Sequence, residues 1–178
     1  MKNKEQVEGL ILVHTGEGKG KSSSAFGMVF RAAGWGMRVL VIQFIKGKWQ
    51  TGEQHAAARF DNIEWHALGD GFTWDTQNPE QDLKTSRDIW AFSREKIETG
   101  DYDLVVLDEI NYCCAYQWLT GAEIAEFLLE RRPRWTHVVL TGRGAPEEVI
   151  SAAHTVTEMR KIKHAFDNGI LAVKGLEF

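Results

Sequence analysis

The sequence has little of what marks a fibrous, secreted or membrane-inserted protein. Its 178 residues include only 3 prolines and 17 glycines, which excludes a collagen-like or low-complexity chain. No stretch approaches the run of about 18 apolar residues that a membrane span needs, and residues 1–10 lack the apolar core of a signal peptide. The two cysteines, Cys113 and Cys114, are adjacent, a poor arrangement for a structural disulfide or a metal site. We therefore expect a reduced, cytoplasmic protein without a membrane partner.

Positively charged residues are also fewer than acidic ones. The chain has 21 lysines and arginines against 25 acidic residues, so its formal net charge is 21 − 25 = −4. Proteins that bind nucleic acid are usually basic, so we expect no nucleic-acid partner. A local loop could still bind a small phosphorylated ligand. The 43% hydrophobic and 26% charged residues are ordinary for a globular protein, and the length predicts one domain over residues 1–178.

Short apolar runs alternate with helical patterns along the chain. Four runs predict buried strands and two weaker ones predict further strands: 9–14, 38–44, 103–107 and 136–140, then 62–68 and 154–158. Spacing and capping signals predict helices at 22–33, from Asn78 to Gly100, from Thr120 to Pro133, and from Pro146 onward. Apart from the weak strand, residues 46–79 predict a long functional loop. The alternation predicts an α/β fold with a mostly parallel sheet and helices on both faces.

The clearest motif joins the first predicted strand to the first predicted helix. Its sequence, HTGEGKGKSS over residues 14–23, lies where a P-loop belongs, although Thr15 stands at the first glycine position of the usual spacing. Glycines let successive N–H groups turn toward one anion, and the helix N-terminus adds positive potential. Lys21 supplies a mobile positive charge, and the Ser22 hydroxyl can ligate Mg²⁺. We assign these residues to the nucleotide: Thr15, Gly16, Glu17, Gly18, Lys19, Gly20, Lys21, Ser22 and Ser23.

Asp108 and Glu109 follow four apolar residues at the end of a predicted strand. This is a Walker-B-like position, where a carboxylate holds Mg²⁺ directly or through water. Many strands end in Asp simply as a turn residue, but beside a P-loop the pair is predicted to hold the metal together with Ser22. The spacing does not decide which carboxylate contacts the ion.

Two arginines are further candidates for the nucleotide site. Arg31 lies on the first predicted helix, from which it either reaches the nucleotide or faces solvent. Arg143 follows a predicted strand at the carboxyl edge of the sheet, where α/β proteins build their sites.

Six segments in order along the chain resemble the corrinoid adenosyltransferases of the CobA/BtuR type: TGEGKGKSSSAFG at 15–27, VIQFIKG at 41–47, GFTWDTQN at 71–78, VVLDEINY at 105–112, LTGRG at 140–144 and KHAFDNG at 163–169. The resemblance implies a RecA-like P-loop domain, typically a homodimer. It also implies ATP-dependent transfer of the 5′-deoxyadenosyl group to the cobalt of a reduced corrinoid, with release of triphosphate. Two departures are Glu17, where relatives often have Asn, and Ser22, where Thr is usual. About eight residues precede the first strand, so we expect a looser enclosure of the corrinoid than in longer relatives.

Roles for individual residues follow from this resemblance. Lys21, with ATP and Mg²⁺ or Mn²⁺, would stabilise the leaving triphosphate. Phe72 and Trp74 would lie beneath the corrin ring and displace its lower axial ligand, so that a flavoprotein could reduce Co(II) to Co(I). Lys163, His164 and Asp167 belong to a family-like segment without an assigned mechanism. Two alternatives remain open: a P-loop ATPase or kinase that cleaves at the γ-phosphate, and a nucleotide-gated corrinoid carrier without chemistry.

Overall fold

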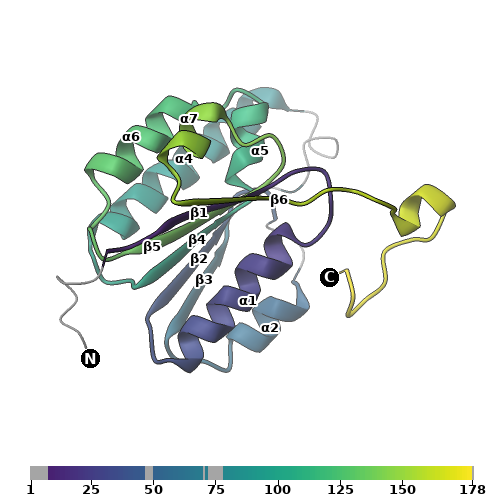
Figure 1. Cartoon of the computed structure of the whole chain (residues 1–178), viewed down its shortest axis with the longest axis horizontal. Helices are drawn as coiled ribbons and strands as arrows, with labels where there is room; N and C mark the ends of the chain where they lie inside the picture. Colours follow the sequence, from purple (N-terminus) through teal and green to yellow (C-terminus); the bar gives the residue numbers. More distant parts are fainter. Residues whose placement is uncertain (1–7, 47–49, 70, 72–77, 178) are drawn as a thin grey trace.

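The computed structural model describes residues 8–46, 50–69, 71 and 78–177. Its centre is a parallel sheet of six strands in the order β3-β2-β4-β5-β1-β6 (Figure 1). The strands are β1 (Ile11–Thr15), β2 (Val39–Gln43), β3 (Ile63–Ala67), β4 (Leu104–Asp108), β5 (His137–Thr141) and β6 (Thr155–Glu158). The predicted α/β class, the parallel sheet and all six strand positions are confirmed.

Helices cover both faces of this sheet, as predicted. Figure 1 shows α1 (Lys21–Gly34) and α2 (Gly52–Ala57) on one side. On the other side lie α4 (Pro79–Glu98), α5 (Ile110–Ala115), α6 (Gly121–Glu130) and α7 (Glu147–Ala152). No helix within the described ranges is both long and apolar enough to cross a membrane.

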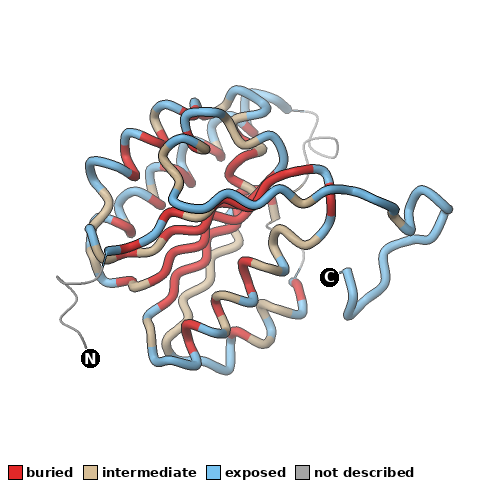
Figure 2. Tube along the Cα trace, in the orientation of Figure 1, coloured by how far each residue is buried: buried red, intermediate tan, exposed pale blue. Residues whose placement is uncertain are grey.

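The four inner strands, β2, β4, β5 and β1, are buried on both faces because alternate residues pack into two different cores. In β2, Leu40 and Ile42 belong to the core beneath α4 and α6, whereas Val39 and Val41 pack against α1. This double burial explains the continuous apolar runs in the sequence. It also turns Gln43, two residues after Val41, toward α1. Figure 2 shows the buried strands between the two helical layers.

Two of the longer helices, α4 and α6, begin at the capping residues that the sequence predicted. The Asn78 side chain accepts a hydrogen bond from the N–H of Gln81, 3.3 Å away, at the start of α4. The Thr120 hydroxyl accepts from the N–H of Glu123 at 3.1 Å and starts α6. Such caps satisfy N–H groups that have no partner inside the helix.

The prediction of a long loop over residues 46–79 was wrong for part of that segment. It contains α2, whose first turn is capped by the Thr51 side chain accepting from the N–H of Gln54. Two other short elements were not predicted: α5, which begins directly after Glu109, and the 3₁₀ turn η2 (Ala165–Asn168). Beyond β6, residues 159–177 leave the sheet as an exposed arm (Figure 1, yellow).

Candidate active site

The phosphate loop connects Thr15, the last residue of β1, to Lys21, the first residue of α1. Gly20 caps the helix with φ 107°, a left-handed conformation that favours glycine. Glycine has no side chain to bond to the N–H groups of the first turn, and that turn contains no acidic residue. A helix of 14 residues therefore presents the positive end of its dipole to the space above the loop.

The loop is held from outside by the segment that follows β6. The N–H of Met159 donates to the Thr15 carbonyl at 2.8 Å, and the N–H of Gly18 donates to the Met159 carbonyl at 2.5 Å. A Cβ at Gly18 would lie 2.7 Å from that same carbonyl oxygen. The close approach of the two backbones therefore explains why residue 18 is a glycine.

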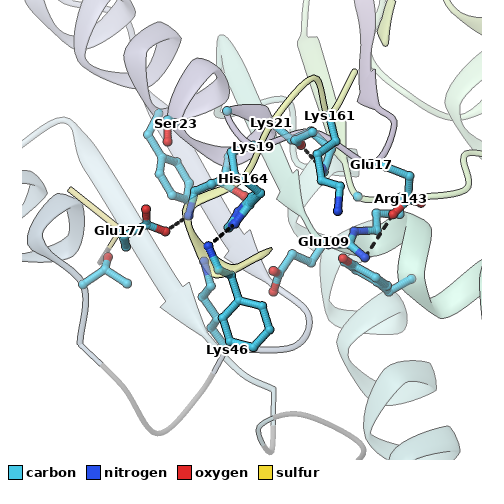
Figure 3. A pocket seen from close by; sticks show the side chains of 18 of the residues that line it. Glu17, Lys19, Lys21, Ser23, Lys46, Glu109, Arg143, Lys161, His164 and Glu177 are labelled. Carbon is cyan, nitrogen blue, oxygen red and sulfur yellow. Dashed lines mark hydrogen bonds and ion pairs between the residues drawn. The ribbon is translucent and has the colours of Figure 1, made fainter. Parts of the chain in front are cut away.

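A cavity of about 730 Å³ opens between the phosphate loop, the carboxyl ends of the strands and the arm. Figure 3 shows Glu109 extending into it between Lys46 and Arg143. Positive side chains come to the cavity from separate parts of the chain: Lys19 and Lys21 from the loop, Lys46 after β2, Arg143 after β5, and Lys161 from the arm. Five acidic side chains line the same cavity and balance these cations in number: Glu17, Glu53, Glu109, Asp167 and Glu177. The part that suits a polyphosphate is therefore the loop itself, where Lys19, Lys21 and the helix N-terminus come together.

Lys21 is bound to its own loop. Its ammonium group donates to the carbonyl oxygens of Gly16 at 2.8 Å and Gly18 at 2.6 Å. Burial, and next the charge of Arg143, lowers the pKa of Lys21. The loop therefore holds a partly desolvated ammonium group where it can exchange carbonyl oxygens for phosphate oxygens.

Other cations of the cavity are paired with carboxylates. Arg143 lies 3.1 Å from Glu17 of the phosphate loop, and Lys19 forms an ion pair with Glu177 of the arm (Figure 3). Both pairs are partly exposed, so the carboxylates compete only weakly with a multiply charged ligand.

The structure separates the roles of Asp108 and Glu109. Asp108 is fully buried, and both of its carboxylate oxygens accept hydrogen bonds, from Gln43 Nε2 at 2.9 Å and from Thr141 Oγ1 at 2.8 Å. It does not line the cavity, whereas Glu109 does. Glu109 is thus the carboxylate that the cavity can use directly.

Glu109 combines an unusual backbone with an unsatisfied side chain. Its φ of 67° is left-handed, uncommon for a residue with a Cβ. Burial, and next the charge of Asp108, raises its pKa to about 7. Among the described residues, Oε2 is buried without a hydrogen-bond partner. Buried oxygens are normally satisfied, so this atom indicates a place for a donor or a cation.

Comparisons with known proteins identify the family. Residues 7–178 match the family described as ATP:corrinoid adenosyltransferase BtuR/CobO/CobP. The chain belongs to this family of ATP:corrinoid adenosyltransferases. A corrinoid adenosyltransferase of Pseudomonas aeruginosa is 49% identical over 173 residues, covering 96% of this chain and 84% of the relative. One from Escherichia coli is 42% identical over 174 residues, covering 98% and 88%.

Solved structures support the fold of this family member as a RecA-like P-loop fold. A KaiC-like protein from Pyrococcus horikoshii superposes with a TM-score of 0.52 at 14% identity, covering 88% of this chain and 75% of that one. The cytoplasmic domain of a type VII secretion ATPase from Thermomonospora curvata gives a TM-score of 0.50 at 15% identity, covering 85% and 20%. At these identities the likeness concerns the fold alone.

The structure brings most of the predicted nucleotide residues of this adenosyltransferase together. The cavity is lined by Arg143, Glu109 and the loop from Glu17 to Ser23. Thr15 lies beneath it, with a hydroxyl that accepts from the N–H of Ala145 at 3.2 Å.

Other predicted residues do not reach the cavity or lie outside the described part of the chain. Arg31 is exposed in the last turn of α1, ten residues and about 15 Å along the helix from Lys21. It lines a separate apolar hollow beside Met28 and Trp35, so the structure favours the solvent-facing alternative for Arg31. Phe72 and Trp74 lie outside the described residues, so their predicted role remains a prediction.

Several cavity residues of this family member had no role in the sequence analysis. Lys46 belongs to the VIQFIKG segment and follows β2 at the carboxyl edge, a position that could have marked it. His164 and Asp167 belong to the KHAFDNG segment, and the arm brings both to the cavity. Tyr112 and Phe166 belong to the VVLDEINY and KHAFDNG segments, although no role was assigned to either. Lys161 and Glu177 lie outside all six segments, and only the path of the arm places them at the cavity.

Proposed function

We propose that the chain transfers the 5′-deoxyadenosyl group of ATP to Co(I) of a reduced corrinoid. The electron pair of Co(I) forms the bond to C5′, the bond between C5′ and its oxygen breaks, and triphosphate leaves with that electron pair. Cobalt itself is the nucleophile, so the protein has to hold C5′ in line with it and stabilise the departing charge.

The family match across residues 7–178 carries this proposal. The cavity supports it, because Lys19, Lys21 and the first turn of α1 converge where a triphosphate would lie. Lys46, Arg143 and Lys161 extend that positive wall beyond the loop. Positive groups fixed in advance around a growing negative charge favour its departure.

The residues present fit a divalent cation, Mg²⁺ or Mn²⁺. Within the described part of the chain, no three histidine, cysteine or acidic side chains gather to hold a metal alone. Mg²⁺ is commonly bound by one or two carboxylates together with substrate phosphates and water. Glu109, whose Oε2 is unsatisfied, and Ser22, which has a hydroxyl, both line the cavity and would hold the ion there. When bound, the ion would neutralise charge on the triphosphate.

The test is a product analysis. The purified chain is mixed anaerobically with ATP, Mg²⁺ and chemically reduced cobalamin. We expect a light-sensitive cobalt–carbon product and one triphosphate for each adenosyl group transferred. ADP and phosphate would indicate an ATPase or kinase instead. Tight corrinoid binding without any turnover would indicate a carrier.

We further propose that Phe72 and Trp74 act on the reduction of cobalt, with a flavoprotein as reductant. Neither ring can donate a lone pair to cobalt, and loss of the lower ligand makes Co(II) easier to reduce. Replacing either by Ala should therefore abolish the reaction that starts from Co(II) and a flavoprotein. The same variants should recover when a strong chemical reductant supplies Co(I). Equal losses in both assays would contradict this role.

We also propose a homodimer that functions in the cytoplasm. The arm supports the dimer, because it leaves the sheet and is exposed along most of its length (Figure 2). It exposes six large apolar side chains: Ile162, Phe166, Ile170, Leu171, Val173 and Leu176. A second copy of the chain would remove these side chains from water. The free thiols of Cys113 and Cys114 agree with a reducing compartment. Light scattering after size-exclusion chromatography should give the mass of two chains.

A further inference from the structure

A continuous chain of hydrogen bonds crosses the sheet below the phosphate loop. It runs through four neighbouring strands, β3, β2, β4 and β5, with one side chain from each. The Trp65 indole N–H donates to Gln43 Oε1 at 2.9 Å, and Gln43 Nε2 donates to Asp108 Oδ2 at 2.9 Å. The Thr141 hydroxyl donates to Asp108 Oδ1 at 2.8 Å and accepts from the N–H of Glu109 at 2.8 Å. This chain of hydrogen bonds thus ends at the backbone N–H of Glu109, the residue whose carboxylate belongs to the cavity.

All four side chains lie on the face of the sheet that α1 covers. Gln43 follows Val41, Asp108 follows Val106, and Thr141 follows Val139, each at the two-residue spacing of one strand face. These three valines pack with Phe26 of α1, and the Trp65 ring lies 4.8 Å from the Phe26 ring. The chain of hydrogen bonds therefore lies between the sheet and the helix that begins at the phosphate loop.

The direction of each hydrogen bond is determined by chemistry. An indole nitrogen can only donate, so it selects the oxygen of the Gln43 amide and leaves the NH₂ group for Asp108. A flipped amide would place two donors together and two acceptors together. Gln43, Asp108 and Thr141 are each fully buried, so water cannot replace a missing partner.

We propose that Gln43 and Thr141 are positioning residues for the metal and nucleotide site. Thr141 joins the Asp108 carboxylate to the Glu109 N–H, and the N–H of Phe44 donates to the Asp108 carbonyl at 3.0 Å. These bonds hold Glu109 in the left-handed conformation that brings its side chain to the cavity. Gln43, which Trp65 orients, fixes the Asp108 carboxylate, and Asp108 in turn fixes the Thr141 hydroxyl that holds the Glu109 N–H. The inference rests on the proposed role of Glu109 toward the cation.

The experiment measures the affinity for ATP by titration calorimetry, with Mg²⁺ and with a chelator in its place. The test variant is Thr141→Val, which keeps the shape and removes the hydroxyl. We expect the Mg²⁺-dependent gain in ATP affinity to fall about tenfold, in the range that loss of an outer hydrogen-bond partner costs a metal site. Affinity without Mg²⁺ should stay within about twofold of the parent value.

Matched variants separate positioning from general damage. Thr141→Ser keeps the hydroxyl and should retain the Mg²⁺-dependent gain. Val41→Ala loses buried volume on the same face without touching the hydrogen bonds, so it should lower stability and leave the gain unchanged. Trp65→Phe keeps a ring against Phe26 and removes the N–H. It should show a smaller loss of the gain, and it carries the test if Thr141→Val does not fold.

Two results would overturn the inference. One is a folded Thr141→Val protein with the parent's Mg²⁺-dependent gain, and the other is an equal loss of affinity with and without Mg²⁺. A parent protein that binds ATP equally in both conditions would instead contradict the metal assignment itself. The failure of the positioning role and the failure of the proposed site are therefore distinguishable.

Discussion

At the scale of single residues, the ammonium group of Lys21 has carbonyl oxygens as partners where phosphate oxygens would lie. It bonds to the carbonyl oxygens of Gly16 and Gly18, so the loop is curved around this ammonium group. Lys21→Ala should remove a charge-assisted contact worth about 1.5–3 kcal/mol, a loss of about 10- to 100-fold in turnover. Single-turnover assays with chemically reduced cobalamin measure it. Lys84→Ala, on the exposed side of α4, is the control. A Lys21→Ala rate within about twofold of the parent would contradict the role.

The two adjacent carboxylates should respond differently to the loss of their charge. Asp108→Asn would turn an NH₂ group toward one of two donors in a buried site, so we expect a loss of stability of about 1–3 kcal/mol. Glu109→Gln leaves the Asp108 hydrogen bonds intact, so we expect a stable protein with impaired Mg²⁺-dependent turnover. Urea unfolding and turnover across a Mg²⁺ series measure the two effects. A fully stable Asp108→Asn beside an unfolding Glu109→Gln would reverse the assignment.

At the scale of secondary-structure elements, the sequence predicted what depends on neighbours along the chain. The strand runs, the caps at Asn78 and Thr120, and the strand–loop–helix context of the phosphate loop are all local patterns. The helix α2 was missed because it has only six residues and lies in a segment with few apolar positions. The helix α5 was missed because it follows β4 after the single residue Glu109, without a connecting loop.

Predictions about the site were limited for the same physical reason, because the site depends on contacts between segments that are far apart along the chain. Spacing placed Asp108 and Glu109 at a strand end, but only the neighbouring strands supply the hydrogen bonds that bury one and leave the other unsatisfied. Lys161 comes to the cavity through the path of the arm, which no local pattern encodes. Arg31 shows the converse, because helical geometry carries it away from the loop despite its nearness in sequence.

A polar cluster joins β3, α4 and the segment before β4. Glu64 accepts from Lys96 at 2.7 Å and from the Tyr102 hydroxyl at 2.5 Å, and it pairs with His66 at 2.7 Å. Burial opposes ionisation of Glu64, but the hydrogen bonds from Lys96, Tyr102 and His66 outweigh it and lower the pKa to about 2. A depressed pKa contributes stability that is present above the ordinary value of 4.5 and is lost as the pH falls toward 2.

Glu64→Gln should therefore destabilise the protein at neutral pH and not in strong acid. Because the side chain is partly exposed, we expect no more than about 1 kcal/mol at pH 7, and no difference from the parent near pH 2. Urea unfolding between pH 2 and 7 measures this change. Asp88→Asn, which removes an exposed pair with Lys84 on the same helix, should change neither value. A stability difference that stays constant down to pH 2 would show that the cluster acts through packing instead.

At the scale of the whole molecule, positive side chains gather at one cavity although the chain as a whole is acidic. The chain carries a formal net charge of −4, yet its cavity is lined by four lysines and an arginine together with five acidic side chains, so formal charges balance there. These cations come from the loop, the ends of β2 and β5, and the arm, so the folded topology is what concentrates them. Lys161 pairs with Asp167 on the arm, while the Glu17 and Glu177 carboxylates pair with Arg143 and Lys19. A triphosphate carries more negative charge than either carboxylate, so it can displace both.

The exposed arm links this cavity to the proposed second copy of the chain. Its apolar side chains have little cover from their own chain, with Ile170 exposed at 55% and Leu171 at 75%. Lys161, His164 and Phe166 of the same arm line the cavity. Replacing Ile170 and Leu171 together by Ser should therefore shift the protein from two chains toward one, and it should also weaken ATP binding by loosening the cavity wall.

Light scattering across a range of protein concentrations measures the first effect, and calorimetry with ATP measures the second. Leu129→Ser is the matched control, because Leu129 is 63% exposed on α6 and lies apart from the arm. It should leave both the mass and the affinity unchanged. A parent protein with the mass of one chain at all concentrations would refute the dimer. An arm variant that keeps the parent's mass but loses ATP affinity would assign the arm to the cavity of its own chain alone.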